Sequence, residues 1–194
     1  MAREIEIKLR CPDFDALRRM LRELQAQPAG VVLEYNRLFD TPDGQLRRAG
    51  CGLRVRELRS TDDDTTAPHP AAVLTYKGPR DPGEIKSRDE YETTVSDATT
   101  LITILNHLGY REIVVYEKRR ESWHLHPCEV TLDELPRLGT FMEIEGPSEQ
   151  TLTAARAQLG LADTPICRES YVELTARHGD LDASGCRRLV FANA

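Results

Sequence analysis

The stretch Glu4-Ile5-Glu6-Ile7-Lys8 decides the fold, because charged and aliphatic side chains alternate in it without a break. On a β-strand, side chains two residues apart share a face, so Glu4, Glu6 and Lys8 point the same way. The opposite face carries Ile5 and Ile7 and is suited to packing. A surface edge strand could have the same pattern, so this stretch alone leaves its role open.

The same two-residue spacing of charges returns along the chain, and the repetition favours a charged interior over a surface strand. Strands that each place a row of charges on one face predict a closed sheet with a charged inside. Burying like charges is costly unless something neutralises them. Internal salt bridges are one candidate, and a bound polyanion together with divalent metal is the other. The recurring rows are Arg54/Arg56, Arg88/Glu90/Glu92, Lys118/Arg120 and Glu143/Glu145.

Length, charge and cysteine content bound the class of protein. A chain of 194 residues with 40% hydrophobic content predicts one domain with one good core. The net charge of −6 argues against nucleic-acid binding through the phosphate backbone. We expect a cytoplasmic protein with no membrane partner, because no apolar stretch approaches the roughly 20 residues of a membrane span and no signal peptide is recognisable. The five scattered cysteines are expected to be reduced structural thiols.

Periodicity and turn residues predict an α+β protein, an eight-stranded antiparallel β-barrel with peripheral helices. We expect a single domain over residues 1–178 and a C-terminal tail over 179–194. Loops at 60–70 and 79–87 are expected to border the mouths of the barrel. The predicted strands cover residues 2–10, 30–40, 51–59, 71–77, 87–95, 111–124, 128–133 and 139–146. The predicted helices begin near Pro12, Gln45, Asp97, Glu149 and Arg168.

The ordered set of motifs resembles that of the CYTH superfamily, the triphosphate tunnel metalloenzymes, which contains class IV adenylyl cyclases and thiamine triphosphatases. Each motif is weak alone, but the set keeps the order of the family over residues 1–146. The resemblance implies an eight-stranded antiparallel tunnel with a triphosphate bound in its centre. Besides the charged rows, it rests on Phe39-Asp40-Thr41-Pro42, Leu53-Arg54-Val55-Arg56, Thr75-Tyr76-Lys77-Gly78, Lys118-Arg119-Arg120, Leu132-Asp133, Gly139-x-Phe141-x-Glu143-x-Glu145 and the late Ser170-Tyr171.

The resemblance also implies roles for individual residues and a triphosphate-containing small molecule, such as ATP or tripolyphosphate, as substrate. The implied phosphate ligands are Lys8, Arg54, Arg56, Lys77, Arg88, Lys118 and Arg120. The implied ligands of Mg²⁺ or Mn²⁺ are Glu4, Glu6, Glu90, Glu92, Asp133, Glu143 and Glu145. The expected catalytic residues are Lys8, Lys77, Glu4 and Glu6. We expect Lys86, Arg119, His124 and His126 to face solvent, and a homodimer is left open.

Two reactions fit the implied site, and the residues favour hydrolysis slightly. Attack of water on the terminal phosphorus makes a triphosphatase, whereas attack of the ribose 3′-hydroxyl of ATP on the α-phosphorus gives cyclic AMP and pyrophosphate. The motif set looks most like the cyclase-named branch, but only Met1-Ala2-Arg3 stands where some cyclases carry a His-Phe pair. Leu38 replaces the aromatic residue expected to orient a thiamine-type substrate. A non-catalytic polyphosphate- or nucleotide-binding module is the less favoured third alternative, because the acids accompany the basic residues.

Overall fold

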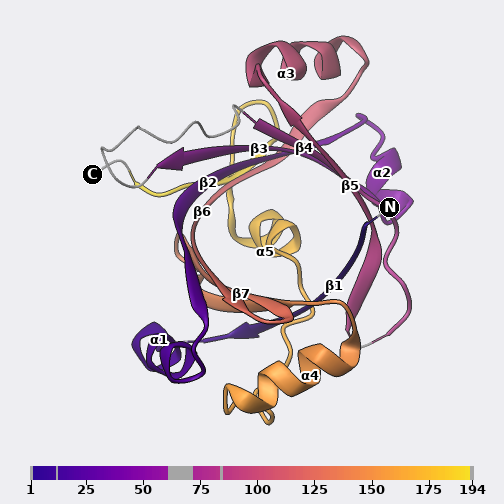
Figure 1. The fold of residues 1–194 in the computed structure, drawn as a ribbon. Coiled ribbons are helices and arrows are strands. Elements are labelled where there is room, and N and C mark those ends of the chain that lie inside the picture. The colour runs from indigo at the N-terminus through magenta and orange to yellow at the C-terminus, as the bar shows by residue number, and fades with distance from the viewer. Residues whose placement is uncertain (1, 12, 61–71, 84, 193–194) are drawn as a thin grey trace.

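The computed structural model describes residues 2–11, 13–60, 72–83 and 85–192, so most of the predicted 60–70 loop lies outside the described residues. Within them, eight strands close into an antiparallel barrel, which confirms the predicted fold (Figure 1). Their order is β2-β3-β4-β5-β1-β8-β7-β6, and β6 pairs back to β2. The strands are β1 (Ala2–Arg10), β2 (Gln27–Asp40), β3 (Gly52–Ser60), β4 (Ala72–Lys77), β5 (Lys86–Val95), β6 (Arg111–Leu125), β7 (Cys128–Leu135) and β8 (Gly139–Glu145).

The register of the barrel sets charged residues of opposite sign beside one another on neighbouring strands. Side chains alternate between the two faces of a strand. When one charged residue faces the inside of the barrel, every second residue along that strand therefore faces inward as well. Directly opposed residues on an antiparallel pair have their Cβ atoms about 5 Å apart, close enough for ion pairs. The opposed pairs are Glu4 with Arg88, Lys8 with Glu143, Glu34 with Lys118 and Arg120 with Asp133.

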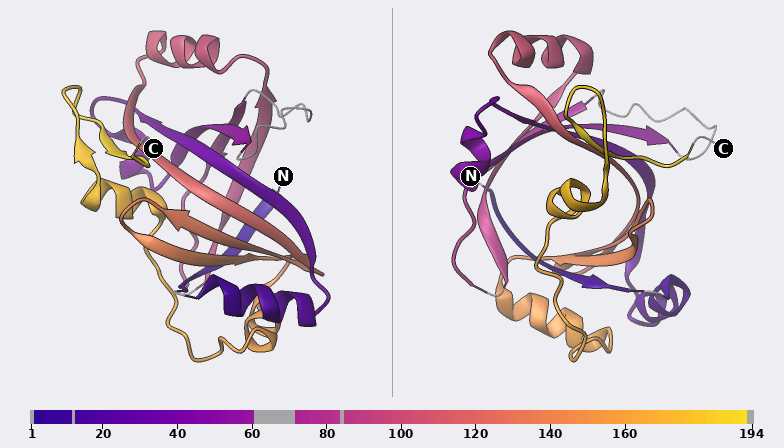
Figure 2. Two further views of the ribbon diagram at one scale, coloured as in Figure 1. Left: turned by 90° about the vertical axis from the view of Figure 1, so that its left-hand side faces the viewer. Right: turned by 180° about the vertical axis from the view of Figure 1, so that it is seen from behind.

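One helix enters the ring of strands, whereas the others lie outside it. α1 (Phe14–Glu23), α2 (Gln45–Arg48), α3 (Ala98–His107) and α4 (Glu149–Gln158) lie around the barrel (Figure 1). Viewed along the barrel from either end, α5 (Tyr171–His178) lies inside the ring, and the side view places it at one end (Figure 2). Its first turn is fixed by a capping box between Ser170 and Glu173, which satisfies two backbone N–H groups.

Apolar packing lies both outside and inside the barrel. Outside, Leu21 of α1 and Leu152 of α4 pack against a buried cluster that includes Leu9. Inside, Tyr171 and Leu174 of α5 pack against inward residues of β2, β6, β7 and β8. The end of the barrel that holds α5 is therefore filled by apolar side chains, and the rest of the interior carries the charges. The inner cluster comprises Leu38, Val114, Tyr116, Leu135, Phe141, Tyr171, Leu174 and Leu189.

The expected C-terminal tail contributes two short strands to the sheet, β9 (Asp180–Leu181) and β10 (Arg187–Leu189). β10 pairs in parallel with Val114–Tyr116 of β6, a stretch that lies before the pairing of β6 with β7 begins. Strands of two or three residues carry no periodicity, so the sequence pattern gave no sign of them. All five cysteines are unpaired thiols. No helix among the described residues is long and apolar enough to cross a membrane.

We predict that Leu9→Ala lowers the free energy of unfolding by about 2–5 kcal/mol, because it leaves a cavity in the cluster outside the barrel. Leu9 is 0% exposed, whereas Leu108 is 68% exposed and provides the matched control as Leu108→Ala. Urea unfolding of both variants measures the difference. Equal stability of the two variants would show that the packing around Leu9 is not as described.

Candidate functional site

A cavity of about 1410 Å³, here called the tunnel cavity, occupies the charged part of the barrel. Strand alternation brings the predicted phosphate ligands of β1, β3, β4, β5 and β6 to its wall, and all seven line it. The predicted metal ligands line it as well, with the exception of Asp133. The predicted residues that line it are the cations Lys8, Arg54, Arg56, Lys77, Arg88, Lys118 and Arg120 and the acids Glu4, Glu6, Glu90, Glu92, Glu143 and Glu145. The lining also includes the basic residues Arg3, Arg47, Arg80 and Arg187 and the acids Asp40, Glu129 and Glu173.

Three cations of β3 and β6 surround two buried carboxylates. Lys118 Nζ lies 3.3 Å from Glu34 Oε2 and 3.2 Å from Asp133 Oδ2. Arg56 Nη1 lies 3.2 Å from Glu34 Oε1, and Arg120 Nη2 lies 2.6 Å from Asp133 Oδ2. The acids satisfy only part of the donor capacity of an ammonium and two guanidinium groups, which together carry thirteen N–H bonds by a rough count of side-chain donors. This part of the wall is therefore suited to an anion.

Asp133 lies behind the wall of the tunnel cavity, where its contacts orient the cations. Its side chain is 0% exposed. Oδ1 accepts a hydrogen bond from Arg120 Nε at 2.7 Å, and Oδ2 accepts one from Tyr171 Oη at 2.9 Å. Because both oxygens are engaged, Asp133 in this arrangement holds Arg120 and Lys118 in place. Its predicted role as a metal ligand has no direct counterpart in these contacts.

Glu34 and Asn36 support this part of the wall from behind, although sequence reasoning did not include them. Both are buried on the inner face of β2, and Asn36 Oδ1 accepts a hydrogen bond from Arg56 Nε at 3.1 Å. Burial would raise the pKa of the Glu34 carboxyl, but Arg56, Lys118 and Arg120 outweigh it and hold that pKa well below its usual range. The available signal was the two-residue spacing of Glu34 and Asn36. It was not recognised because Asn36 is uncharged, whereas the other rows consist of charged residues.

Tyr171 is a second site residue that the predicted set omitted, although its Ser-Tyr motif was recognised. It reaches the charged region from α5 and is itself buried. Lys8 Nζ lies 3.8 Å and Lys118 Nζ 5.1 Å from the centre of its ring, within the range of cation–π attraction. With its hydroxyl bound to Asp133, Tyr171 joins the apolar end of the barrel to the charged part.

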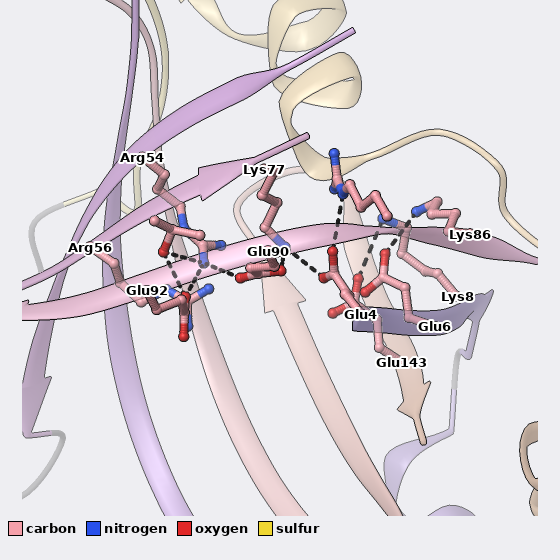
Figure 3. A network of polar contacts seen from close by, with 12 residues as sticks. Glu4, Glu6, Lys8, Arg54, Arg56, Lys77, Lys86, Glu90, Glu92 and Glu143 are labelled. Atoms are coloured by element: carbon pink, nitrogen blue, oxygen red, sulfur yellow. Dashed lines mark hydrogen bonds and ion pairs between the residues drawn. The ribbon is translucent and has the colours of Figure 1, made fainter. Parts of the chain in front are cut away.

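The acids of β1, β5 and β8 gather on another part of the wall (Figure 3). Glu4 lies 2.6 Å from Lys77 Nζ and 3.0 Å from Arg88 Nε, and Lys77 is also 2.7 Å from Glu90. Burial raises the pKa of Glu4, but Lys77 and Arg88 outweigh it and lower that pKa to about 2. The carboxylate of Glu4 is therefore ionised at neutral pH.

Two other acids on this part of the wall retain protons near neutral pH. Glu145 is exposed at the end of β8, but partial desolvation of its carboxyl group and the nearby charges of Glu4 and Glu6 raise its pKa to about 7. Burial also raises the pKa of Glu90 to about 7, with Glu4 adding to the effect and Lys77 opposing it. Carboxyl groups that repel one another in this way mark a place where added positive charge is favourable.

The donor set on this part of the wall fits a hard divalent cation, because carboxylate oxygens are the ligands that Mg²⁺ and Mn²⁺ prefer. Glu4, Glu6 and Glu145 are the side chains whose mutual repulsion such an ion would relieve. Among the described residues, no three acidic, histidine or cysteine side chains already converge as a ready-made ion site. Glu4 and Glu6 are engaged in ion pairs, Glu4 with Lys77 and Arg88 and Glu6 with Lys86.

The expectation that Lys86 faces solvent was wrong, whereas Arg119, His124 and His126 are exposed as predicted. The Lys86 side chain is 10% exposed, and its Nζ lies 3.2 Å from Glu6 Oε1. Lys86 precedes Arg88 by two residues on β5, so strand alternation gives both the same face. It was missed because it was assigned to the preceding loop.

Arg54 carries an unused donor inside the barrel. Its residue exposure is 9%, and its Nη2 lies 3.3 Å from Glu92 Oε1. Its Nε is buried and has no hydrogen-bond partner among the described residues. Leaving such a group unpaired costs about 1–3 kcal/mol, more when it is charged, so Arg54 has a donor that this arrangement does not satisfy.

Comparisons with known proteins agree with this geometry. A family model described as the CYTH domain matches residues 2–171. The chain is 29% identical over 182 residues to adenylate cyclase CyaB of Aeromonas hydrophila, covering 87% of this chain and 86% of that protein. A solved structure from Pyrococcus horikoshii OT3 is 26% identical with a TM-score of 0.72, covering 88% and 97% of the two chains. HpAC1 from Hippeastrum, described as having a dominant triphosphatase activity, shares the fold at 20% identity, with a TM-score of 0.63 and coverage of 93% and 98%.

We predict that Glu34→Gln lowers the free energy of unfolding by about 3–5 kcal/mol at pH 7, because it leaves buried cations without their counter-ion. The folded-state pKa of Glu34 lies below its ordinary value of 4.5, so the ionised group stabilises the fold above pH 4.5. That contribution is lost as the pH falls through the folded-state pKa, so the difference between wild type and variant should narrow on acidification.

Urea unfolding at several pH values measures this difference. Glu23→Gln, at an exposed position of α1, is the control and should leave stability nearly unchanged. A Glu34→Gln variant as stable as wild type at pH 7 would contradict the described charge balance.

Proposed function

This chain belongs to the CYTH domain family, and we propose that it is a divalent-metal-dependent enzyme that hydrolyses a phosphoanhydride bond of a triphosphate bound in the tunnel cavity. The observation that carries the proposal is that all seven predicted phosphate ligands line one cavity, with the buried Arg54 Nε lacking an acceptor among the described residues. A chain of phosphate groups supplies many oxygens of the required charge along the length of the barrel.

The proposed division of the wall follows the distribution of charge. Arg54, Arg56, Lys118 and Arg120 bind the phosphate oxygens on the side supported by Glu34 and Asp133. Lys8, Lys77 and Arg88 complete the contacts on the side of β1, β4 and β5. These groups hold the triphosphate in one orientation and offset the charge that develops on its oxygens during transfer. Tyr171 and Asp133 are proposed as positioning residues, because they act through the cations.

Glu4, Glu6 and Glu145 would hold the divalent ion, with Glu90, Glu92 and Glu143 as further candidates from the acid set. When bound, the ion supplies Lewis-acid polarisation of the phosphate oxygens beside it. In the proposed hydrolysis, a bond forms from a water oxygen to the terminal phosphorus and the adjacent P–O anhydride bond breaks. The proton of the water ends on the phosphate products. The basic side chains bind the departing charge on the leaving phosphate.

Cyclisation of ATP is the second candidate, favoured by the name of the Aeromonas relative, adenylate cyclase CyaB, at 29% identity. The tunnel cavity also has room for more than three phosphate groups, since its volume of about 1410 Å³ exceeds the roughly 300–1,000 Å³ of a common small-molecule pocket. A substituent on the triphosphate could therefore enter with it. A non-catalytic phosphate-binding module is less favoured, because acids suited to a metal accompany the basic groups.

We predict that phosphorus NMR of the protein with ATP or tripolyphosphate and Mg²⁺ or Mn²⁺ will detect orthophosphate as a product. A cyclic phosphodiester signal together with pyrophosphate would instead identify the cyclase. Binding without any product would support the non-catalytic module. Glu6→Gln is the control and should abolish metal-dependent turnover while leaving the fold near normal, because it removes a proposed metal ligand.

We predict that Arg54→Ala weakens triphosphate binding by about 2 kcal/mol, roughly thirtyfold, because it removes a charged hydrogen-bonding partner. Arg119→Ala is the matched control, since the Arg119 side chain is 51% exposed on the other face of β6. Calorimetric titration with tripolyphosphate measures both variants. Similar affinities for the two would place the triphosphate elsewhere.

A further inference from the structure

The neighbour of β1 on one side changes partway along the strand. Pairing with β5 ends at Glu6 opposite Lys86, although β1 continues to Arg10. Beyond that point, the connection between α4 and α5 covers the edge of β1, through the hydrogen bond from Cys167 N to Lys8 O at 2.7 Å and a bridge between Leu9 and Ile166. A second cavity, here called the lateral pocket, lies between this connection and the turn after β4. Its charged lining residues are Glu6, Lys8, Arg80, Asp81, Lys86 and Arg168.

The lateral pocket has room for one small group and excludes a whole triphosphate. Its volume is about 140 Å³, against about 1410 Å³ for the tunnel cavity. At about 30 Å³ for each water molecule in the liquid, this corresponds to about four or five waters. An orthophosphate ion, with five non-hydrogen atoms, is of that scale.

Positive charge predominates in the lateral pocket. Lys8 and Lys86 lie deepest, with side chains 1% and 10% exposed, and Arg80 and Arg168 stand at the exposed rim. Lys86 Nζ lies 3.2 Å from Glu6 Oε1, and Lys8 Nζ lies 3.5 Å from Glu143 Oε1. Each ammonium group has three N–H donors, so one carboxylate contact leaves capacity for another acceptor. Two buried ammonium groups that converge in this way suit a phosphate oxyanion.

The lateral pocket and the tunnel cavity share part of their walls. Glu6, Lys8 and Arg80 line both, and Figure 3 shows Lys86 beside Glu6 and Lys8. Lys86 and Arg168 line the lateral pocket only, whereas Arg54 lines the tunnel cavity only. The ammonium group of Lys86 therefore lies on the lateral side of the residues that the two cavities share.

We propose that the lateral pocket is a second anion site, which binds one phosphate group while the tunnel cavity holds the triphosphate. The identity of that group rests on the proposed function: it is the orthophosphate that hydrolysis releases. The transfer moves an intact ion between two sets of cations and makes or breaks no covalent bond. It gives the product a path through the barrel wall, separate from the path of the next substrate.

The test is titration of the full-length protein with orthophosphate while a non-hydrolysable, methylene-bridged triphosphate saturates the tunnel cavity. We expect orthophosphate to bind under these conditions, with phosphorus NMR line broadening or calorimetry as the readout. Lys86→Gln should weaken its binding about tenfold or more, because a buried charged donor is lost. Arg168→Ala, at an exposed position, should weaken it about fivefold, because one positive charge at the rim is lost.

Arg54→Ala is the matched control and should weaken binding of the triphosphate analogue while leaving orthophosphate affinity within about twofold of wild type. Loss of orthophosphate binding when the analogue is present, or wild-type affinity in both Lys86→Gln and Arg168→Ala, would overturn the proposal. Because the titration involves no turnover, a protein that hydrolyses nothing would still give this result. Failure of the second anion site is thereby distinguished from failure of the proposed function.

Discussion

The need to neutralise buried charge governs the interior of this barrel. Cations from five strands face inward, and each must find acids or an anion, since an isolated buried charge is too costly. Glu34 and Asp133 meet part of that need from behind the cavity wall, where they are fully paired. The cations that line the tunnel cavity keep further donor capacity, and Arg54 Nε has no partner among the described residues. Stability and anion binding therefore draw on the same side chains.

Much of the fold could be predicted because strand alternation is a local property. The row Glu4, Glu6, Lys8 has a period of two, and every strand that repeats it turns its charges to the same side. The order of the motifs then identified the barrel and seven of the eleven basic residues that line the tunnel cavity in the described part of the chain. β9 and β10 could not be predicted, because strands of two and three residues carry no pattern.

The parts of the site that could not be predicted depend on three-dimensional neighbours. Glu34 is one acid in a strand of mostly neutral residues, and its importance comes from three cations of β3 and β6. Asp133 looked equivalent to the other acids in sequence, yet its contacts place it behind the cations. Lys86 changed from a loop residue to an interior residue because β5 begins one position earlier than its pattern indicated.

The position of α5 has a consequence for biosynthesis. Leu38, Val114 and Phe141 face the inside of the barrel, and residues 171–189 supply the apolar side chains that cover them. A ribosome delivers those residues after all eight barrel strands. The nascent barrel therefore exposes an apolar lumen until residues 171–189 have been synthesised. Chaperones matter most in that interval, because exposed apolar surface is prone to aggregation.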